Sequence, residues 1–291
     1  MNALLHEVSL PRVLCREITT DDTPGVIDLL TRGFSSGREF WRRAFASMKA
    51  HDTPSGLPRY GYLLECRRRP VGVLLTINST TIEDGSVRCN FSSWYVEPEY
   101  RAFAAMLVSR ALRRKDVTYL NLTPAPATVA ILKAQGYKQL FSGRAFAFPV
   151  LRSPPAGARV LPVESRKFDP AGLSADEERL LRRHASFGCI SVVCRIGSRA
   201  YPFVFSRRVM NRAVPVALLV YCRGIEEFVL CAGALGRHLA KRGVAAVSIL
   251  SNGPTEGVPG FHLANRPTFF IGPAPPKEGD LAYTECAMFH V

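Results

Sequence analysis

The sequence predicts an α/β chain in two similar halves, each a twisted, mostly antiparallel sheet with one central parallel pair and flanking helices. Strand-like and helix-like segments follow one another in the first half in the order β-α-α-β-β-β-α-β-α-β. This mixed order predicts an antiparallel front and one parallel crossover. The 291 residues correspond to two domains at roughly 150 residues each. A weak internal repeat supports the same division.

The first half alternates strands with amphipathic helices. Residues 21–24 (DDTP) open the first helix, because they supply a polar N-cap and a proline in the first turn. A second helix over 38–49 carries apolar residues at the spacing i, i+3, i+4, i+7. Two further helices are predicted over 103–115 and 127–135. The predicted strands cover 12–18, 60–66, 71–79, 87–96, 117–122 and 145–150.

The second half repeats this organisation. Residues 174–177 (SADE) form a capping box, in which Ser174 and Glu177 each accept a backbone amide of the other, and they open a helix that ends near Gly188. A second helix over 226–242 stops at Gly243, the residue type that favours a left-handed helix end. The predicted strands cover 189–194, 201–206, 214–221 and 244–250.

The two halves align weakly on each other. When Leu112 is set against Leu239, strand 117–122 falls on 244–249, and further along the chain 144–149 corresponds to 266–273. Proline and glycine in the connecting segment are typical of a linker. We therefore predict a first domain over 1–150, a linker over 151–172 and a second domain of the same fold over 173–291.

The charge balance is the unusual feature of the composition. Lys and Arg number 38 against 24 Asp and Glu, a net charge of +14, which favours an anionic ligand or an acidic partner. Eight cysteines without a CxxC pair and scattered histidines predict reduced structural thiols and no metal. No apolar stretch approaches the roughly 20 residues that span a bilayer, and the N-terminus lacks a signal-peptide pattern. We expect a cytoplasmic protein without a membrane partner.

The most informative stretch is WYVEPEYRAFAAMLVSRAL, residues 94–112, which joins a strand to a helix. Free amides at the start of such a helix can hold an anion such as a pyrophosphate. Val96, Pro98 and Arg101 resemble the V-x-P-x-x-R pattern of the acyl-CoA-binding segment in the GNAT N-acetyltransferase superfamily. The later AILKAQGYKQL, residues 130–140, resembles the family's second segment, a short helix followed by a Gly-Phe/Tyr pair, here Gly136 and Tyr137. The resemblance covers the first half well and the second half more faintly.

The resemblance implies a tandem of two GNAT-like domains that uses acetyl-CoA or another acyl-CoA as co-substrate. In that fold the fourth and fifth strands splay apart, the pantetheine arm lies in the gap, and amides of the next turn bind the pyrophosphate. An amine acceptor, either a small molecule or a peptide, attacks the thioester directly while a base removes its proton. Carried onto this chain, the cofactor-binding residues are Trp94, Tyr95 and Val96 of the strand and Arg101, Ala102, Phe103, Ala104, Ala105 and Met106 of the turn.

Two departures from the family pattern bear on activity. The turn has alanine and methionine where the family prefers glycine, which restricts close approach of backbone to a phosphate. Leu132 stands where a tyrosine often protonates the departing thiolate. Ser92 and Asn121 are candidate catalytic residues, because they are polar residues in strands expected to be buried. Hydrogen bonding within the sheet is the alternative interpretation of both.

Strand alternation gives each side chain near this turn an expected face. Glu97 and Glu99, on either side of the turn proline, are expected to face solvent. The fourth strand is expected to place Asn90, Ser92 and Trp94 on one face and Cys89, Phe91, Ser93 and Tyr95 on the other.

The second half carries acidic residues at the equivalent turn. Glu226 and Glu227 would repel a pyrophosphate, so we expect a degenerate second domain that shapes the acceptor site. The glycines of AGALG, residues 232–236, lie inside a predicted helix, where close packing explains them.

An acyl-CoA-dependent N-acyltransferase is the function that these observations favour. The alternative is a non-catalytic GNAT-fold protein that binds CoA or a protein partner, which the glycine-poor turn and Leu132 support. Specific nucleic-acid binding is not expected, because basic and aromatic residues are not interleaved on a strand face and no helix-turn-helix or zinc pattern occurs. The sequence indicates no oligomeric state.

Overall fold

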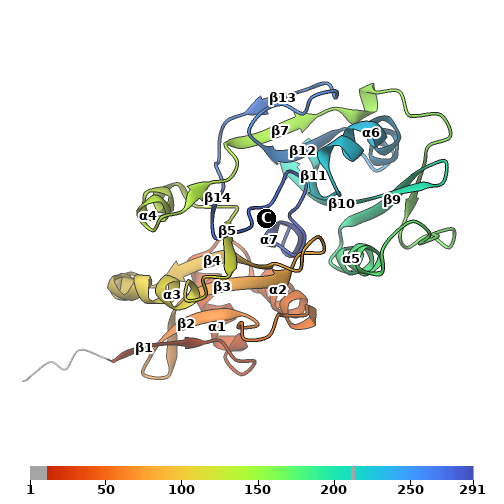
Figure 1. Cartoon of the computed structure of the whole chain (residues 1–291). Helices are drawn as coiled ribbons and strands as arrows, with labels where there is room; N and C mark the ends of the chain where they lie inside the picture. The colour runs from red at the N-terminus through yellow and green to blue at the C-terminus, as the bar shows by residue number, and fades with distance from the viewer. Residues whose placement is uncertain (1–11, 211–213, 291) are drawn as a thin grey trace, which may run out of the picture. The chain divides into compact units, whose positions relative to one another are not determined.

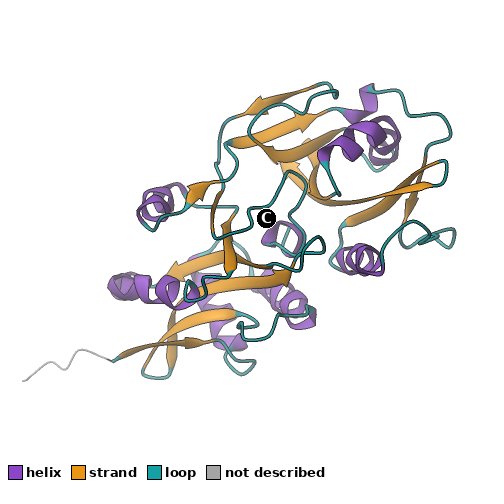
Figure 2. Ribbon diagram, viewed as in Figure 1, coloured by secondary structure: helices purple, strands orange, loops and turns teal. Residues whose placement is uncertain are grey.

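A computed structural model describes residues 12–210 and 214–290, which form two seven-stranded sheets with flanking helices (Figures 1 and 2). The chain divides into two compact units. The first contains the described residues up to Thr76 together with Phe91–Arg114, and the second contains Ile77–Asn90 and the described residues from Lys115 onward. Two strands, β3 and β4, run from one unit into the other.

The first unit contains the opening strands of one sheet. Strand β2 pairs antiparallel with both β1 and β3. The predicted helix over 103–115 is divided into a 3-10 helix, which begins at Pro98, and an α-helix that ends at Ala111. The elements are β1 (Val13–Glu17), α1 (Thr23–Gly33), α2 (Arg38–Ala50), β2 (Gly61–Cys66), most of β3 (Arg69–Thr80), the end of β4 (Val87–Val96), the 3-10 helix η1 (Pro98–Phe103) and α3 (Ala104–Ala111).

An ion-pair network joins β1, α1 and β2 in the first unit. Arg16 donates two 2.7 Å hydrogen bonds to the carboxylate of Asp22 and a 3.0 Å bond through Nε to Glu65. Asp22 precedes α1 as predicted, but its carboxylate is taken up by Arg16 and by Thr19 instead of capping the helix. The Arg16 guanidinium holds the pKa of the Asp22 carboxyl well below its usual range.

The second unit contains the rest of the first sheet and the whole of the second. Ser174 and Glu177 form the predicted capping box at the start of α5. The elements are β5 (Val117–Asn121), η2 (Pro126–Thr128), α4 (Val129–Ala134), β6 (Lys138–Gln139), β7 (Gly143–Ala147), η3 (Pro149–Leu151), β8 (Arg159–Pro162), α5 (Ala175–Ser186), β9 (Ile190–Ile196), β10 (Arg199–Met210), β11 (Val214–Tyr221), α6 (Ile225–Ala240), β12 (Ala246–Ser251), β13 (Gly260–Leu263), β14 (Phe269–Ile271) and α7 (Glu285–Met288).

The two sheets repeat each other strand for strand. The first has the order β1-β2-β3-β4-β5-β14-β6, and the second, taken from its other edge, has the order β8-β9-β10-β11-β12-β7-β13. Each contains one parallel pair, β4 with β5 and β11 with β12. A mixed α/β chain of two similar sheets is therefore confirmed.

The halves also exchange a strand. β7 lies at the end of the first half of the chain but pairs with β12 and β13 in the second sheet. β14, in the second half, pairs with β5 and β6 in the first sheet. The expectation that strand 145–150 completes the first sheet was wrong. The exchange is reciprocal, because 144–149 and 266–273, which the repeat aligns, contain parts of these two strands. The division of the chain at 150 and 173 stays a prediction.

The segment predicted as a linker contains structure. Within 151–172, β8 pairs antiparallel with β9 and forms an edge of the second sheet. Proline is tolerated on an edge strand because one side of that strand has no ladder to break. The four-residue strand β8 was not predicted, because proline and glycine in this segment are typical of a linker.

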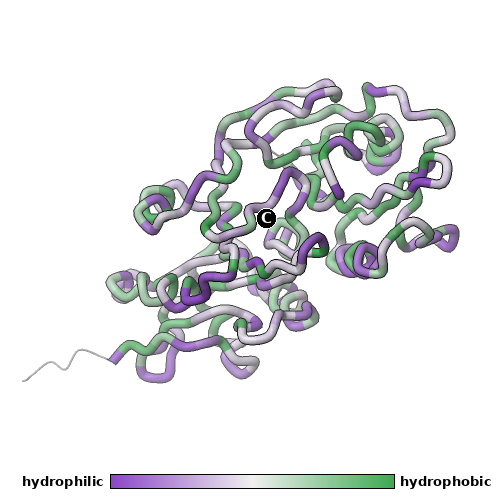
Figure 3. Tube along the Cα trace, viewed as in Figure 1, coloured by the Kyte–Doolittle hydropathy of each residue, from purple (hydrophilic) through white to green (hydrophobic). Residues whose placement is uncertain are grey.

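Helix α6 covers one face of the second sheet. Its side chains Phe228, Cys231 and Leu235 are fully buried against residues of β7, β9, β10, β11 and β12, and Figure 3 shows hydrophobic stretches along this helix and these strands. Gly233 and Gly236 bring α6 against the backbone of residues 149–154, where an added Cβ would lie within 3.0 Å of main-chain atoms. The glycines of AGALG are packing residues, as predicted.

Candidate active site

The predicted cofactor segment lies in the first unit as the end of β4, η1 and the start of α3. Val96 is buried, and Trp94 and Tyr95 are half-buried. The indole N–H of Trp94 is buried and has no hydrogen-bond partner among the described residues. A buried donor of this kind is costly unless an acceptor satisfies it.

Ser93 interrupts the regular alternation of β4. Its φ is 51°, in the left-handed region that a serine in a strand rarely adopts. The four residues Cys89–Ser92 before it are all buried, and the Ser92 and Ser93 hydroxyls lie 3.1 Å apart. The expectation that Ser92 and Ser93 lie on opposite faces was wrong, because a left-handed residue breaks the pleat. Ser92 is hydrogen-bonded within the strand.

Glu97 is buried, whereas it was expected to face solvent. Its side chain is 11% exposed and lies 2.9 Å from the guanidiniums of both Arg32 and Arg69. The ion pairs fasten the end of β4 to α1 and to β3, and the Glu97 carboxylate raises the pKa of Arg69. Glu99 is exposed as expected. The two glutamates thus differ because only one of them meets arginines from other elements.

Tyr95 packs against the end of α1. A Cβ added at Gly33 would lie within 3.0 Å of the Tyr95 ring, and the rings of Phe34 and Tyr95 are 6.1 Å apart. Tyr95 also lines a shallow hollow of about 440 Å³, whose lining includes Arg32, Arg69 and Tyr100. The side chain of Tyr95 is used for packing, which leaves its backbone as the part that could contact a ligand.

The start of α3 presents an exposed surface next to Arg101. Arg101, Ala102, Ala105 and Met106 are exposed, and Phe103 and Ala104 are half-buried. The first turn of α3 contains no acid, and no side chain caps the helix. Both features favour an anion, since the positive end of the helix dipole is left uncompensated. The amide of Ala104 already donates to the Arg101 carbonyl, so one amide of the predicted set is occupied.

In the second unit, β4 and β5 form the parallel pair of the first sheet, with a register that runs from Val87 opposite Val117 to Asn90 opposite Leu120. The predicted candidate Asn121 is half-buried at the end of β5, opposite Phe269 of β14. The exposed residue Thr123 follows two positions later.

A buried carboxylate from the far end of the chain lies at this point. Glu285, the first residue of α7, is 2% exposed. Thr123 Oγ1 donates a 2.6 Å hydrogen bond to Glu285 Oε1, and the Glu285 amide donates to Asn90 Oδ1 at 3.2 Å. Glu285 was not among the residues that the sequence pattern predicted for the site. The available signal was an acid within the otherwise apolar run ECAMF, a pattern that marks a charge with a specific environment.

The second predicted segment comprises most of α4 and the residues that follow it. Leu132 is buried in the core, so its side chain supplies no acid. Tyr137 is also buried, and this burial, followed by the proximity of Cys89 and Tyr119, raises its pKa above the usual range. The phenol therefore stays protonated.

The described residues contain neither a metal-binding cluster nor a membrane-spanning helix. No group of three or more His, Cys, Asp or Glu side chains in 12–210 and 214–290 could hold a metal ion. No helix of the described chain combines the length and apolar character needed to cross a membrane.

Comparison with known proteins identifies the fold. No protein-family model matches the sequence, and no curated protein does. A Pyrococcus horikoshii structure with a proposed acetyltransferase activity aligns over 97% of both chains, with a TM-score of 0.54 and 12% identity. GCN5-related N-acetyltransferases from Anabaena variabilis and Kribbella flavida each align over 89% of this chain and over 72% and 71% of their own. Their TM-scores are 0.54 and 0.52, at 10% and 12% identity. The chain thus has the fold of the GCN5-related N-acetyltransferases, built on two sheets of the same strand order.

Proposed function

We propose that the protein is an acyl-CoA-dependent N-acyltransferase that transfers an acyl group, most simply acetyl, to an amine. The observation that carries the proposal is the turn between β4 and α3, which is exposed, basic at Arg101, free of acid in the first helical turn and uncapped by any side chain. Such a turn suits the pyrophosphate of CoA. Of the two acids that flank Pro98, Glu97 is neutralised by two arginines, and Glu99 is exposed to solvent.

The strand that leads into this turn also suits the pantetheine arm. Pantetheine contains two amide groups, and an amide carbonyl next to Trp94 would satisfy its buried indole N–H. The proposed cofactor-binding residues remain Trp94, Tyr95, Val96, Arg101, Ala102, Phe103, Ala104, Ala105 and Met106. Tyr95 would take part through its backbone, since its ring packs on Gly33.

The proposed reaction is direct attack of an amine on the thioester carbonyl. A C–N bond forms, the C–S bond breaks, CoA leaves as the thiolate, and the amine loses a proton to a base. The buried phenol of Tyr137 and the aliphatic Leu132 do not supply an acid for the thiolate. A thiolate can leave unprotonated more readily than an alkoxide because thiols are the stronger acids, and solvent protonates it afterwards.

Calorimetric titration of acetyl-CoA into the full chain tests the proposal. Arg101→Ala should weaken binding about 10-fold, the effect of losing one exposed charge-assisted contact. Ala104→Glu should abolish binding, because a carboxylate would sit at the anion position. Arg43→Ala, an exposed arginine of α2, is the matched control and should bind as the wild type does. No binding by the wild type at millimolar ligand would refute the proposal.

A second function, CoA binding without catalysis, is favoured by the absence of glycine from the turn and by the buried Leu132. Release of CoA thiol from acetyl-CoA in the presence of amines separates the two. Saturable binding without thiol release would favour the binding protein.

A further inference from the structure

We infer that a cavity of the second unit, at the carboxyl ends of β11 and β12, binds a small aliphatic amine in its ammonium form. The cavity has a volume of about 280 Å³, and all of its lining residues belong to this unit. This volume is just below the range that holds drug-sized ligands, so it suits a single short-chain molecule. The inference does not depend on the proposed acyl transfer, whose residues lie in the first unit.

The position of the cavity is the first argument. In open α/β sheets, ligands bind beyond the carboxyl ends of the strands. β11 and β12 form the parallel pair of the second sheet. Tyr221, the last residue of β11, lines the cavity, and so does Glu278, whose carboxyl lies near the backbone amide of Asn252, the first residue after β12. In the repeated strand order β11 takes the place of β4, so the cavity adjoins the second-half counterpart of the turn after β4.

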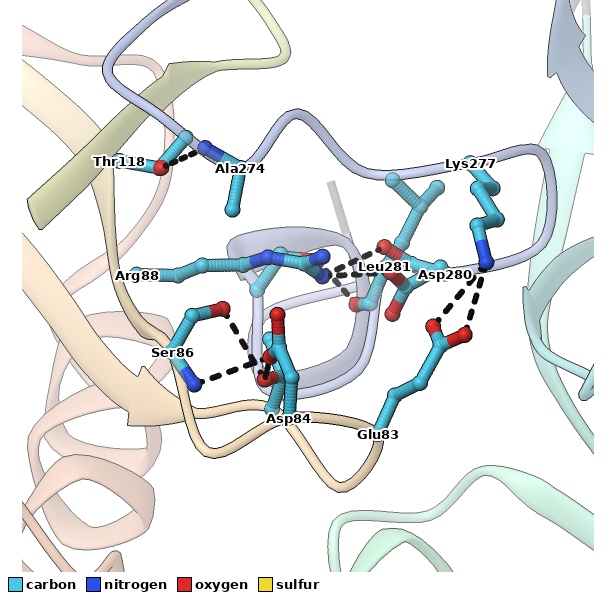
Figure 4. Close-up of polar contacts among 11 residues, drawn as sticks. Glu83, Asp84, Ser86, Arg88, Thr118, Ala274, Lys277, Asp280 and Leu281 are labelled. Atoms are coloured by element: carbon cyan, nitrogen blue, oxygen red, sulfur yellow. Dashed lines mark hydrogen bonds and ion pairs between the residues drawn. The ribbon is translucent and has the colours of Figure 1, made fainter.

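The charge of the lining is the second argument. Four carboxylates and only two basic side chains line the cavity, although the whole chain has a net charge of +14. Three of these carboxylates are matched by a basic partner, and Figure 4 shows two of the pairs. The pairs are Lys277 with Glu83 at 2.8 Å, Arg88 with Asp280 at 2.7 Å, and Arg223 with Glu177 at 2.9 Å.

Glu278 is the carboxylate of the lining that has no base. It is half-buried and forms no ion pair with any described residue. Burial raises the pKa of its carboxyl above the usual range and Glu226 adds to the shift, although the Asn252 amide and His262 oppose it. A partly buried charge without a partner is costly. An ammonium ion bound in the cavity would compensate it.

Tyr221 supplies an independent indication of a ligand. The residue is only 8% exposed and lines the cavity, yet its hydroxyl has no hydrogen-bond partner among the described residues. Buried hydroxyls are normally satisfied. A phenol oxygen can accept a hydrogen bond from an ammonium group, which has donors only. A single ammonium group would therefore satisfy both Glu278 and Tyr221.

The rest of the wall favours an organic cation. Ile82 and the buried Cys222 add apolar surface to the lining. A metal ion gains nothing from such surface, whereas an alkyl chain gains free energy when it leaves water. The ligand that matches the cavity is therefore a short alkyl chain with a primary ammonium group at one end.

Calorimetric titration of n-pentylamine into the full chain at pH 7, without acetyl-CoA, tests the inference. Alkylamines are protonated at this pH, as lysine is, and the wild type should bind the amine saturably. Glu278→Gln should weaken binding about 10-fold, the effect of losing a charge-assisted contact, and Tyr221→Phe about 3-fold. The matched control is Glu256→Gln, an exposed glutamate outside the lining, which should bind as the wild type does. n-Pentanol, which has the same chain without the charge, should bind at least about 10-fold more weakly.

Thermal unfolding separates a binding role from a structural one. Because Glu278→Gln removes a charge that the free protein does not compensate, its midpoint without ligand should stay at or above the wild-type value. A lowered midpoint would show that Glu278 stabilises the fold and would overturn the inference. Equal affinity of the wild type and Glu278→Gln, equal affinity for n-pentanol and n-pentylamine, or no binding of millimolar n-pentylamine by the wild type would each overturn it as well. None of these results bears on acetyl-CoA binding, which is measured separately.

Discussion

Substitution of Gly236 by alanine measures how closely α6 packs on the segment after β7. The Cβ of an alanine at this position would lie within 3.0 Å of three backbone atoms of Pro149 and Val150. Backbone atoms cannot rotate away as a side chain can, so helix and segment must separate. Overpacking of a close contact costs about 1–3 kcal/mol, and the upper end applies because all three neighbours are main-chain atoms.

The steric cost is partly offset by local propensity. Alanine is better than glycine inside a helix by about 1 kcal/mol. The net loss of unfolding free energy is therefore about 2 kcal/mol. In a unit of about 150–250 residues, 1 kcal/mol shifts the thermal midpoint by roughly 2–4 °C, so the expected decrease is about 4–8 °C.

The assay is thermal and urea unfolding followed by circular dichroism. Gly253→Ala is the control, because no atom lies within 4 Å of its added Cβ and its φ is not positive; its midpoint should stay at or above the wild-type value. A Gly236→Ala variant with an unchanged or raised midpoint would refute the close approach of α6 to residues 149–150. It would also reopen a ligand-binding role for AGALG.

Two further substitutions test ion pairs of the first unit. Asp22→Asn should lower the unfolding free energy by about 1 kcal/mol at neutral pH, a value discounted because Arg16 is 38% exposed. Because folding lowers the pKa of Asp22, the difference in unfolding free energy between wild type and variant should persist above about pH 5 and shrink as the pH falls below about 4. Urea titrations at pH 7, 5 and 3 measure this difference. A pH-independent difference would contradict the ion pair. Glu97→Gln should lower stability by about 1 kcal/mol because it leaves two arginines without their shared carboxylate, whereas exposed Glu99→Gln should be neutral. Equal urea midpoints for the two variants would contradict the burial of Glu97.

Local sequence patterns predicted most helices and strands, because these patterns depend on interactions between residues that are close in the sequence. The capping box at Ser174 and the glycine after α6 satisfy helix-end backbone groups within a few residues, so they are legible without any tertiary contact. The missed elements were short. β6, β8, β13, β14 and α7 have two to four residues each, too few to show a period.

The candidate site was predictable in part. Pro98 and Arg101 favour a turn and an anion site through properties of a few neighbouring residues. The structure forms the predicted strand-to-helix turn there. The faces of β4 were not predictable, because the left-handed conformation of Ser93 breaks the alternation that a strand pattern assumes. Glu285 lies 195 positions from Asn90 and 162 from Thr123, and no spacing rule connects such distances.

The sequence by itself determined the order of helices and strands, the repeat between the halves and the basic turn after β4, because hydrophobic period, caps and charge are properties of short segments. Only the tertiary structure decided which sheet each strand joins, that Glu97 is buried, and that Glu285 meets Asn90 and Thr123. A strand's pattern specifies which face is apolar but not which strand pairs with it, and β7 and β14 satisfy the same pattern in either sheet. The burial of a charge depends likewise on partners that the fold supplies from distant parts of the chain.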